Sequence, residues 1–173
     1  LEILDISDPT NPQHVGAVTD SASTELDGAS GIAVQGIYAY IVSNVDDGIQ
    51  VFDISDPANP VNVGVLTDDA TTALNGATDI HVQGKYAYIT GIDDDGVEVV
   101  SISHPTTTNP VHVGVIYDSS TFELDGAQSI SIQGRQAYIV ANIDDGIEVL
   151  EIAGLETPSA NIGSLSVGNL DVW

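Results

Sequence analysis

The clearest pattern of apolar and polar positions lies at residues 48–55, where both alternating sets of side chains are apolar. Ile49 and Val51 fall on one face of an extended chain, and Phe52 and Ile54 fall on the other. A strand that is apolar on both faces must be covered on both faces, as strands of sandwich cores and parallel sheets are. The stretch therefore predicts an inner strand of a layered β structure.

The same pattern recurs along the chain, at residues 1–6, 96–102 and 146–152. Residues 1–7 and 48–55 are followed by Asp-Pro-x-Asn-Pro, and proline cannot continue a strand ladder because it has no N–H to donate. The third copy keeps both prolines in a turn that is lengthened near 106–108. An inner strand that ends in a rigid turn is thus repeated about every 48 residues.

Each repeat contains four strand candidates, at 31–35, 38–42, 49–55 and 61–67 in the best-preserved copy. A glycine turn joins the first two and predicts a hairpin, and an Asp-Asp-Gly turn joins the second and third. β-branched residues are frequent, and no stretch has a helical period. Four short antiparallel strands per unit of about 45 residues are typical of a propeller blade. The sequence therefore predicts an all-β fold of four-stranded antiparallel β-propeller blades, about three and a half of them.

Two motifs recur together in register: Gly-Ile-Gln-Val-Phe-Asp-Ile-Ser-Asp-Pro-Ala-Asn-Pro at 48–60 and Gly-Lys-Tyr-Ala-Tyr-Ile at 84–89. In these residues nearly the whole chain resembles the LVIVD-repeat family. The resemblance implies a β-propeller, typically of secreted or surface-exposed bacterial and archaeal proteins, with no catalytic residues attached to it. The loop at 67–77 also resembles a subset of these repeats found in acidic, often marine, archaeal proteins.

Alignment of the repeats divides the single predicted domain into a half-blade and three blades. We expect the half-blade at 1–19, blades at about 30–68, 77–118 and 127–166, and a tail at 167–173. This is fewer than the roughly four blades that a closed ring needs, and an open arc leaves strand edges and a blade face uncovered. We therefore expect either a segment of a longer polypeptide, whose true N-terminus lies elsewhere, or a homo-oligomer or polymer in which copies complete one another.

The charge of the chain narrows the range of partners. Twenty-six acidic side chains stand against only Lys85 and Arg135, which gives a formal net charge of −24. Nucleic acid is disfavoured because phosphate binding requires Lys and Arg, and anionic membrane surfaces are disfavoured for the same reason. No apolar run approaches the length of a membrane span. The chain has no Cys, so neither disulfides nor a thiolate metal site are available.

The turns and loops that emerge on one face of such a propeller carry dense carboxylates. These groups repel one another unless water, salt or a cation lies between them. Oxygen ligands beside glycine turns, without His or Cys nearby, suit Ca²⁺ better than zinc or copper. We predict that each blade-to-blade loop and its neighbouring Asp-Asp-Gly turn form one Ca²⁺ site. The candidate metal ligands are Asp20, Glu25, Asp27, Asp46, Asp47, Asp68, Asp69, Asn75, Asp94, Asp95, Asp118, Glu123, Asp125, Asp144 and Asp145.

The alternative interpretation of these carboxylates is a solvated acidic face in a high-salt organism, with Asp serving as a turn-forming residue. The pattern has neither the spacing of an EF-hand loop nor a calcium-binding nonapeptide repeat. The calcium hypothesis therefore depends on composition, and both interpretations stay open.

Histidine and tyrosine provide the other candidate side chains. His14 and His112 occupy the same position of an outer strand, and no histidine has a partner at metal-ligand spacing, so we expect structural rather than catalytic histidines. Tyrosines recur on one face of the second strand, where packing between blades is expected and a sugar-stacking platform is the alternative. They are Tyr38, Tyr40, Tyr86, Tyr88 and Tyr138.

These observations predict a non-catalytic extracellular or cell-surface module that assembles with other copies, or with the rest of a longer chain, into a surface layer, matrix or filament stabilised by Ca²⁺. The alternative is a secreted ligand- or carbohydrate-binding propeller with a pocket in its acidic loop face. An enzyme is the least favoured class. A glycosidase needs one defined pair of carboxylates, whereas the repeated Asp-Asp-Gly turns single out none.

Overall fold

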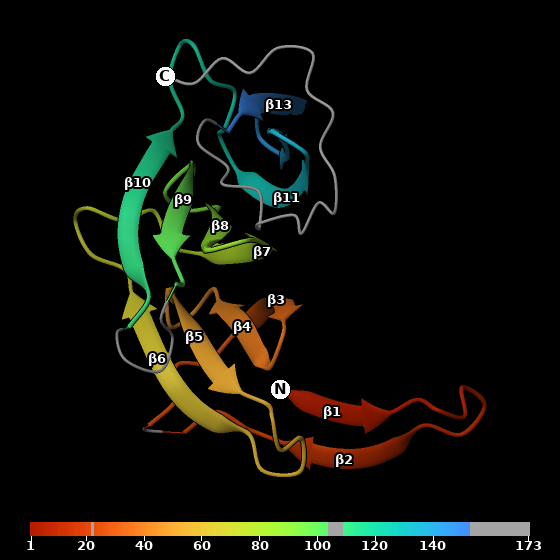
Figure 1. The fold of residues 1–173 in the computed structure, drawn as a ribbon. Helices are drawn as coiled ribbons and strands as arrows, with labels where there is room; N and C mark the ends of the chain where they lie inside the picture. Colours follow the sequence, from red (N-terminus) through yellow and green to blue (C-terminus); the bar gives the residue numbers. More distant parts are fainter. Residues whose placement is uncertain (22, 104–108, 153–173) are drawn as a thin grey trace, which may run out of the picture.

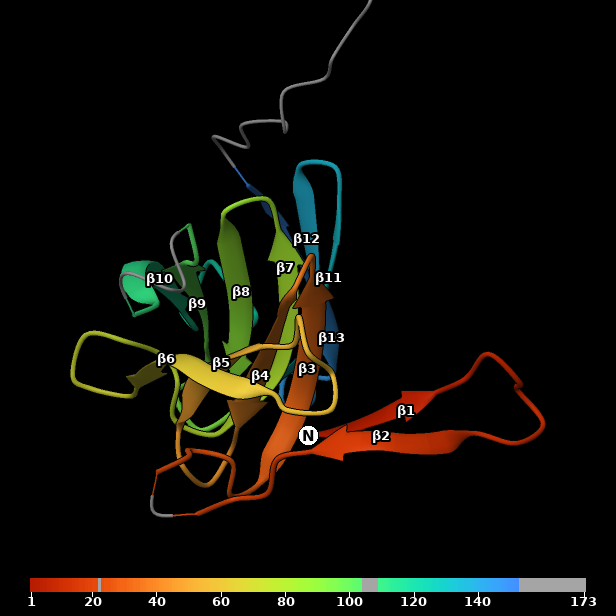
Figure 2. The ribbon, with the colours of Figure 1, turned by 60° about the horizontal axis from the view of Figure 1, so that its bottom comes forward.

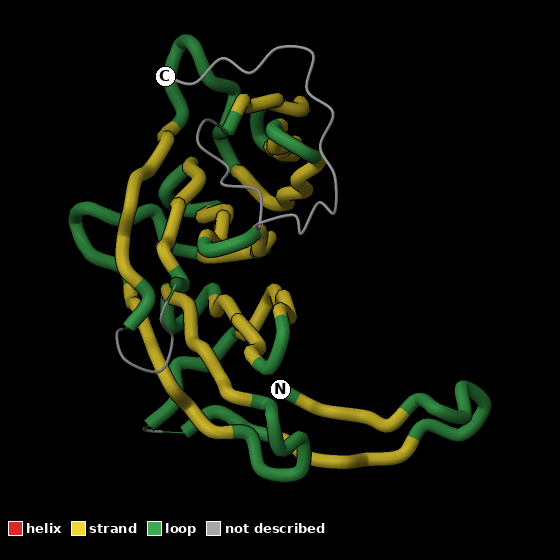
Figure 3. The backbone as a smooth tube through the Cα atoms, in the orientation of Figure 1, coloured by secondary structure: helices red, strands yellow, loops and turns green. Residues whose placement is uncertain are grey.

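The computed structural model describes residues 1–21, 23–103 and 109–152. Figure 3 shows these ranges as strands joined by loops and turns. The strands are β1 (Glu2–Asp5), β2 (Gln13–Ala17), β3 (Ala29–Gln35), β4 (Tyr38–Ser43), β5 (Gly48–Asp53), β6 (Val61–Thr67), β7 (Ala77–Gln83), β8 (Tyr86–Gly91), β9 (Gly96–Ser101), β10 (Val111–Tyr117), β11 (Ala127–Gln133), β12 (Gln136–Ala141) and β13 (Gly146–Glu151). Within these ranges, no helix has the length and apolar character of a membrane span.

Strands that follow one another in the chain pair side by side in antiparallel sheets. β1 and β2 form a two-stranded sheet, the half-blade; β3–β6 form the first blade and β7–β10 the second blade. β11–β13 form the described part of the third blade, and the predicted end of this blade at 153–166 and the predicted tail at 167–173 lie outside the described residues. The predicted all-β fold of antiparallel propeller blades is therefore confirmed. The blades lie along an arc that does not close, with the half-blade projecting at its N-terminal end (Figures 1 and 2).

A tight glycine turn joins the first two strands of every blade. Gly36, Gly84 and Gly134 have φ angles of 62°, 63° and 64°, in the left-handed region that other L-residues rarely adopt. A Cβ atom at any of the three would meet nothing within 4 Å, so the backbone conformation alone requires glycine there. The predicted hairpin therefore follows from turn chemistry.

Apolar side chains hold successive blades together. Tyr40, Ile49 and Val51 of the first blade pack in one buried cluster with Ile80 and Val100 of the second blade. An equivalent cluster joins the second and third blades, and a smaller one joins the half-blade to the first blade.

The central strand of the first blade is covered on both faces, as the pattern at 48–55 predicts. Ile49 and Val51 are fully buried against the second blade. Phe52, on the opposite face, is buried with Leu1 and Ile54 packed around it. The covering of each face by a different neighbour makes the blades depend on one another.

Each blade thus presents two apolar faces to its neighbours. We call the side chains equivalent to Tyr40, Val42, Ile49 and Val51 the front face. We call the side chains equivalent to Phe52 and Ile54 the rear face. Inside the chain, the front face of one blade packs against the rear face of the next.

The third blade has an uncovered front face. Ile147 is 69% exposed and Val149 is 50% exposed, whereas their equivalents Ile49 and Val51 are 0% exposed. Tyr138 is likewise exposed, although Tyr40 is buried. The difference arises because no described residue packs on the third blade as the second blade packs on the first.

Polar links between blades supplement the apolar contacts. The Ser30 hydroxyl donates to the Ala77 carbonyl of the next blade at 2.6 Å. The Gln35 side-chain amide donates to the Gly84 carbonyl at 2.7 Å, and the Gln83 amide donates to the Gly134 carbonyl at 3.3 Å. These Gln–Gly links lie at the hairpin turns between first and second strands, so they fix the spacing of neighbouring blades along one rim of the arc.

The equivalence of Ile49 and Ile147 provides a direct test of inter-blade packing. We expect Ile49→Ala to lower the free energy of unfolding by about 2–5 kcal/mol, because it leaves a cavity between two blades. Ile147→Ala should cost about 0.5 kcal/mol or less, because that side chain is exposed. Chemical denaturation in dilute solution measures both, and similar losses for the two variants would contradict the assignment of faces.

Candidate functional site

The acidic loops and the Asp-Asp-Gly turns lie together on the rim opposite the hairpin turns. The loop that follows each fourth strand begins against the turn of its own blade, since the Asp68 N–H donates to the Asp47 carbonyl at 2.7 Å. The Asp118 N–H donates to the Asp95 carbonyl at the same distance. We call this rim, with its loops and turns, the acidic rim.

The first aspartate of each Asp-Asp-Gly turn accepts a hydrogen bond from the loop that enters the same blade. The pairs are the Asp27 N–H to Asp46 Oδ2 at 2.7 Å, the Asn75 N–H to Asp94 Oδ2 at 3.0 Å and the Asp125 N–H to Asp144 Oδ2 at 2.9 Å. A carboxylate that accepts a backbone N–H forms a strong, charge-assisted hydrogen bond. These side chains therefore hold the entering loop against the blade.

The second aspartate of the turn reaches the next blade. Asp47 Oδ1 accepts the Gly76 N–H at 2.8 Å, and Asp95 Oδ1 accepts the Gly126 N–H at 2.9 Å. Asp47 and Asp95 have positive φ angles of 51° and 52°, and Gly76 and Gly126 also have positive φ. We call these contacts the Asp–Gly links. Asp145 has the same φ of 52°, but no such link is found within the described part of the chain.

The first residue of each loop fixes a buried leucine. Oδ1 of Asp20, Asp68 and Asp118 accepts the N–H of Leu26, Leu74 and Leu124 at 3.1, 3.1 and 2.9 Å, respectively. All three leucines are buried in the clusters between blades. The carboxylate therefore shapes the loop so that its leucine enters the core.

Asp69 closes a smaller turn inside its loop. Its Oδ1 accepts the Thr71 N–H and the Thr71 hydroxyl at 2.7 and 2.6 Å. These hydrogen bonds stabilise the charged form and hold the pKa of Asp69 below its ordinary value. Asp69 is thus a turn-forming aspartate, as one of the two interpretations of the acidic face supposes.

The backbone N–H groups of Glu25 and Glu123 donate to side chains of the third strand, as described below. Desolvation raises the pKa of Asp125, and the neighbouring charge of Asp95 adds to the effect. Desolvation is also the main reason that the pKa of Asp94 is raised. Burial is thus the main cause of both raised pKa values, and repulsion from neighbouring carboxylates adds to it.

The predicted metal ligands act largely as acceptors for backbone N–H groups. Within residues 1–21, 23–103 and 109–152, no group of three or more His, Asp or Glu side chains has an arrangement suited to a metal ion. The Asp-Asp-Gly turns and the loops do lie together, as the calcium hypothesis requires. Calcium binding itself stays a prediction.

A polar side chain in the middle of the third strand of each blade also holds a loop, although the sequence pattern did not point to this role. Gln50 Oε1 accepts the Glu25 N–H at 3.0 Å. Glu98 Oε2 accepts the Ala73 N–H at 3.1 Å, and Glu148 Oε2 accepts the Glu123 N–H at 3.2 Å. The available signal was a Gln or Glu recurring inside an otherwise apolar strand.

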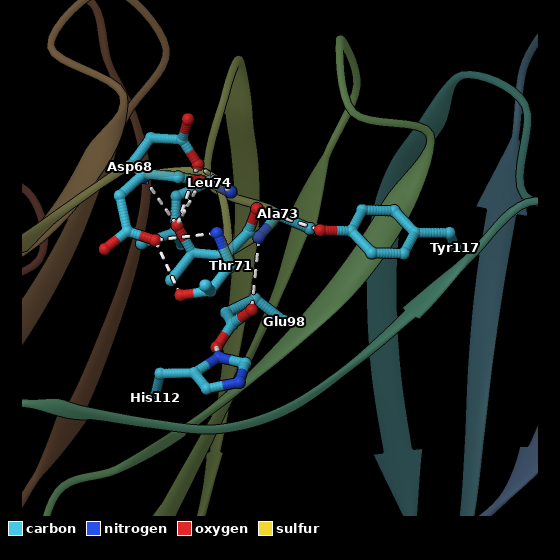
Figure 4. A network of polar contacts seen from close by, with 9 residues as sticks. Asp68, Thr71, Ala73, Leu74, Glu98, His112 and Tyr117 are labelled. Atoms are coloured by element: carbon cyan, nitrogen blue, oxygen red, sulfur yellow. Dashed lines mark hydrogen bonds and ion pairs between the residues drawn. The ribbon is translucent and has the colours of Figure 1, made fainter.

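Glu98 is the most deeply buried of these groups, with an exposed fraction of 0%. Figure 4 shows it between the Ala73 N–H and His112, whose Nδ1 lies 2.6 Å from Glu98 Oε1. Burial raises the pKa of Glu98, and the hydrogen bonds from His112 and Ala73 oppose this rise only in part. In the same network, the Tyr117 hydroxyl donates to the Thr72 carbonyl at 3.1 Å.

The Glu98–His112 pair has a counterpart in the half-blade, where His14 Nδ1 lies 2.5 Å from Glu2 Oε1. The first blade has the neutral residues Gln50 and Asn62 at the two equivalent positions. A pair that recurs in the half-blade and the second blade indicates a structural role for these histidines. His81 lies on β7, where burial lowers its pKa, and His104 lies outside the described residues.

The tyrosines occupy the front faces. Tyr40 and Tyr88 are buried between blades, and Tyr38 and Tyr86 pack at the edges of the same clusters. The prediction that these side chains pack between blades is therefore confirmed by the structure. Tyr138 is exposed because it belongs to the uncovered front face of the third blade.

The Asp–Gly link can be tested with a matched pair of variants. Asp47→Ala and Asp145→Ala both place alanine at a positive φ that aspartate tolerates better, so the two variants share the same backbone cost of at most about 1–2 kcal/mol. Only Asp47→Ala also breaks a bond to the next blade, so we expect it to lower the free energy of unfolding by a further 1–3 kcal/mol, roughly. Chemical denaturation measures the difference, and equal losses would show that the link contributes nothing.

Because the pKa of Glu98 is raised, we expect its contribution to folding stability to depend on pH. The unfolded chain loses this proton near the ordinary value of 4.5, and the folded chain loses it only at higher pH. Between these two pKa values the folded state binds more protons, so the contribution of Glu98 to stability falls as pH rises and then levels off. Glu98→Gln keeps the acceptor for Ala73 but removes the charge, so its stability relative to the wild type should rise across that window.

Thermal or chemical unfolding of both proteins at a series of pH values measures this difference. Glu148→Gln is the control, because it makes the same change at the equivalent, partly exposed position. The pH-dependent gain should be clearly larger for Glu98→Gln. A gain that shrinks as pH rises would contradict the burial effect.

Comparison with known proteins agrees with this geometry. The LVIVD repeat profile matches residues 1–20, 28–68 and 76–115, together more than half of the chain. A search of curated proteins finds no match.

Among solved structures, a candidate 6-phosphogluconolactonase from Bacteroides uniformis aligns with a TM-score of 0.68 at 20% identity, over 87% of this chain and 44% of that chain. A functionally unknown protein from Desulfotomaculum acetoxidans aligns with a TM-score of 0.66 at 18% identity, over 87% of this chain and 47% of that chain. The chain thus spans less than half the length of these proteins. Likeness at this identity shows a shared fold, and the match to the repeat profile shows the family: the chain belongs to the LVIVD-repeat family.

Proposed function

We propose that this chain is a non-catalytic structural or interaction module of an extracellular or cell-surface protein. Its blades assemble with other copies, or with the rest of a longer chain, in a surface layer, matrix or filament. The observation that carries the proposal is the uncovered front face of the third blade. Its side chains are exposed, although the equivalent side chains of the first blade are buried.

Energetics support assembly. The uncovered front face consists of Tyr138, Val140, Ile147 and Val149, which lie on adjacent strands. Complete burial of one such large apolar side chain is worth about 1.5–3 kcal/mol. A contiguous apolar patch of this kind on a chain of such high charge is typical of an interaction surface. A partner that covered it would therefore gain substantial free energy.

A non-catalytic role is supported by the use of the polar side chains. The Glu98–His112 pair and the Asp–Gly links hold loops and neighbouring blades. Most of the predicted metal ligands likewise accept backbone N–H groups. Repeated structural use of the same positions favours a scaffold over a single reactive centre.

The alternative, a ligand-binding propeller, requires a pocket in the acidic face. A pocket of about 350 Å³ lies between the second and third blades and is lined by Tyr86, Tyr88, Val97, Val99, further apolar residues and one carboxylate, that of Glu151. This pocket is mostly apolar and is not formed by the acidic loops. It therefore supports assembly better than a ligand site in the acidic face.

Calcium is the second part of the proposal. A bound divalent cation would reduce the repulsion between the carboxylates of Asp95 and Asp125. The net charge of −24 opposes close approach of copies, and divalent cations or salt would reduce this opposition. Ca²⁺ at about ten times its dissociation constant would stabilise each site by about 1.4 kcal/mol.

Sedimentation velocity of the purified chain tests both parts. We expect concentration-dependent association in molar salt, and association together with a higher melting temperature in millimolar Ca²⁺ compared with EDTA. Monomers at every concentration, salt level and calcium level would overturn assembly. Association in high salt with no effect of Ca²⁺ on either measurement would contradict the calcium part of the proposal and would support assembly.

A further inference from the structure

The contact between a front face and a rear face is built three times within the chain. Phe52 packs on the half-blade, Val100 packs on the first blade and Leu150 packs on the second blade. These three residues occupy equivalent positions of the third strand, and all three are buried. The contact is therefore a standard interface of this chain, with one side from each of two successive blades.

The half-blade carries an uncovered rear face. Leu4 and Ile6 occupy the positions of Val100 and Ile102, yet they are 48% and 68% exposed, whereas Val100 and Ile102 are 0% and 5% exposed. The half-blade stands at the N-terminal end of the arc, so nothing in the described chain lies on its rear side (Figure 1).

The two ends of the arc are therefore the two sides of one interface. Among the described residues, no rear face covers the front face of the third blade, and no front face covers the rear face of the half-blade. Each side repeats the strand positions that form this contact inside the chain. Both surfaces are made of apolar side chains, and carboxylates are densest on the acidic rim.

We infer that the rear face of the half-blade, Leu4 and Ile6, binds the front face of the third blade, Val149 and its neighbours, in a second copy of this chain. The inference rests on the proposed function and names its partner. The contact is heterologous, since the two copies use different surfaces, so copies add head to tail and each new copy leaves one free end of each kind.

The contact between copies is smaller than the contact between blades within the chain. The described half-blade has two strands, so Ile80, which the first strand of the second blade contributes to its contact with the first blade, has no counterpart in it. A groove of about 260 Å³ beside Leu1 and Ile32 stays open for the same reason. Association is therefore weak and reversible, and it strengthens with salt because screening reduces repulsion between highly charged copies.

Two charge-introducing variants test the inference. Leu4→Glu places a charge in the apolar rear face of the half-blade, and Val149→Glu places a charge in the apolar front face of the third blade. Val111→Glu is the control, because Val111 is 53% exposed but lies on the outer strand β10. In molar salt, we expect the wild type and Val111→Glu to associate alike, and each end variant alone to sediment as a monomer, with at least a tenfold weaker association.

A mixture of the two end variants gives the decisive result. Leu4→Glu keeps an intact front face and Val149→Glu keeps an intact rear face, so the mixture should form a one-to-one dimer that grows no further. Dimers of Leu4→Glu alone would indicate a front-to-front contact and overturn the inference. Far-ultraviolet circular dichroism checks that both variants are folded, which is expected because both positions are exposed.

Cross-linking supplies a second measurement that does not depend on these variants. The chain has no cysteine, so Leu4→Cys and Val149→Cys introduce single thiols. A short bifunctional thiol reagent should join the two variants in a mixture and yield little product from either alone. The head-to-tail contact would be overturned if the wild type associates, the mixed cysteine variants give no cross-linked product and the two glutamate variants associate as the wild type does. The proposal of assembly would not be overturned by that result. A wild type that never associates would overturn both.

Discussion

The structure depends on a strand that must be buried on both of its faces. The third strand of each blade is apolar on its front and rear sides, and a blade can cover neither side by itself. Val51 and Phe52 are adjacent in sequence, yet they are buried by different neighbours. Folding of one blade is therefore coupled to the presence of the next, as in other repeat proteins whose stability comes from contacts between neighbouring units.

Polar groups determine how the blades are spaced within this apolar stack. The Asp–Gly links join each turn to the loop of the following blade, and the Gln–Gly links join the hairpin turns on the other rim. Glu98 is buried where it anchors one loop, and the free-energy cost of burying its carboxylate is offset in part by hydrogen bonds from the Ala73 N–H and from His112. The carboxylates of the acidic rim are thus part of the framework, whatever ions they also bind.

The blade could be predicted from the sequence because the signals that define its strands and turns are local in the chain. Glycine turns such as Gly36, the Asp-Pro turns and the two-faced pattern at 48–55 each act within a few residues. The roles of Gln50 and Glu98 were not predicted, because their backbone donors lie 25 residues earlier in the chain. The aspartates were correctly placed together on one rim. Which backbone N–H each one accepts depends on the positive φ of Asp47 and Gly76, and this is set by the packing of whole blades.

The two rims of the arc differ in a way that has a mechanical consequence. Carboxylates are densest on the acidic rim, where the Asp–Gly links cross between blades, whereas neutral amide bonds such as that from Gln35 to Gly84 cross between blades on the other rim. Repulsion between carboxylates therefore acts against the links of the acidic rim, and dissolved ions screen this repulsion. We expect the spacing of the blades on that rim, and with it the curvature of the arc, to respond to ionic strength more than the spacing on the hairpin rim does.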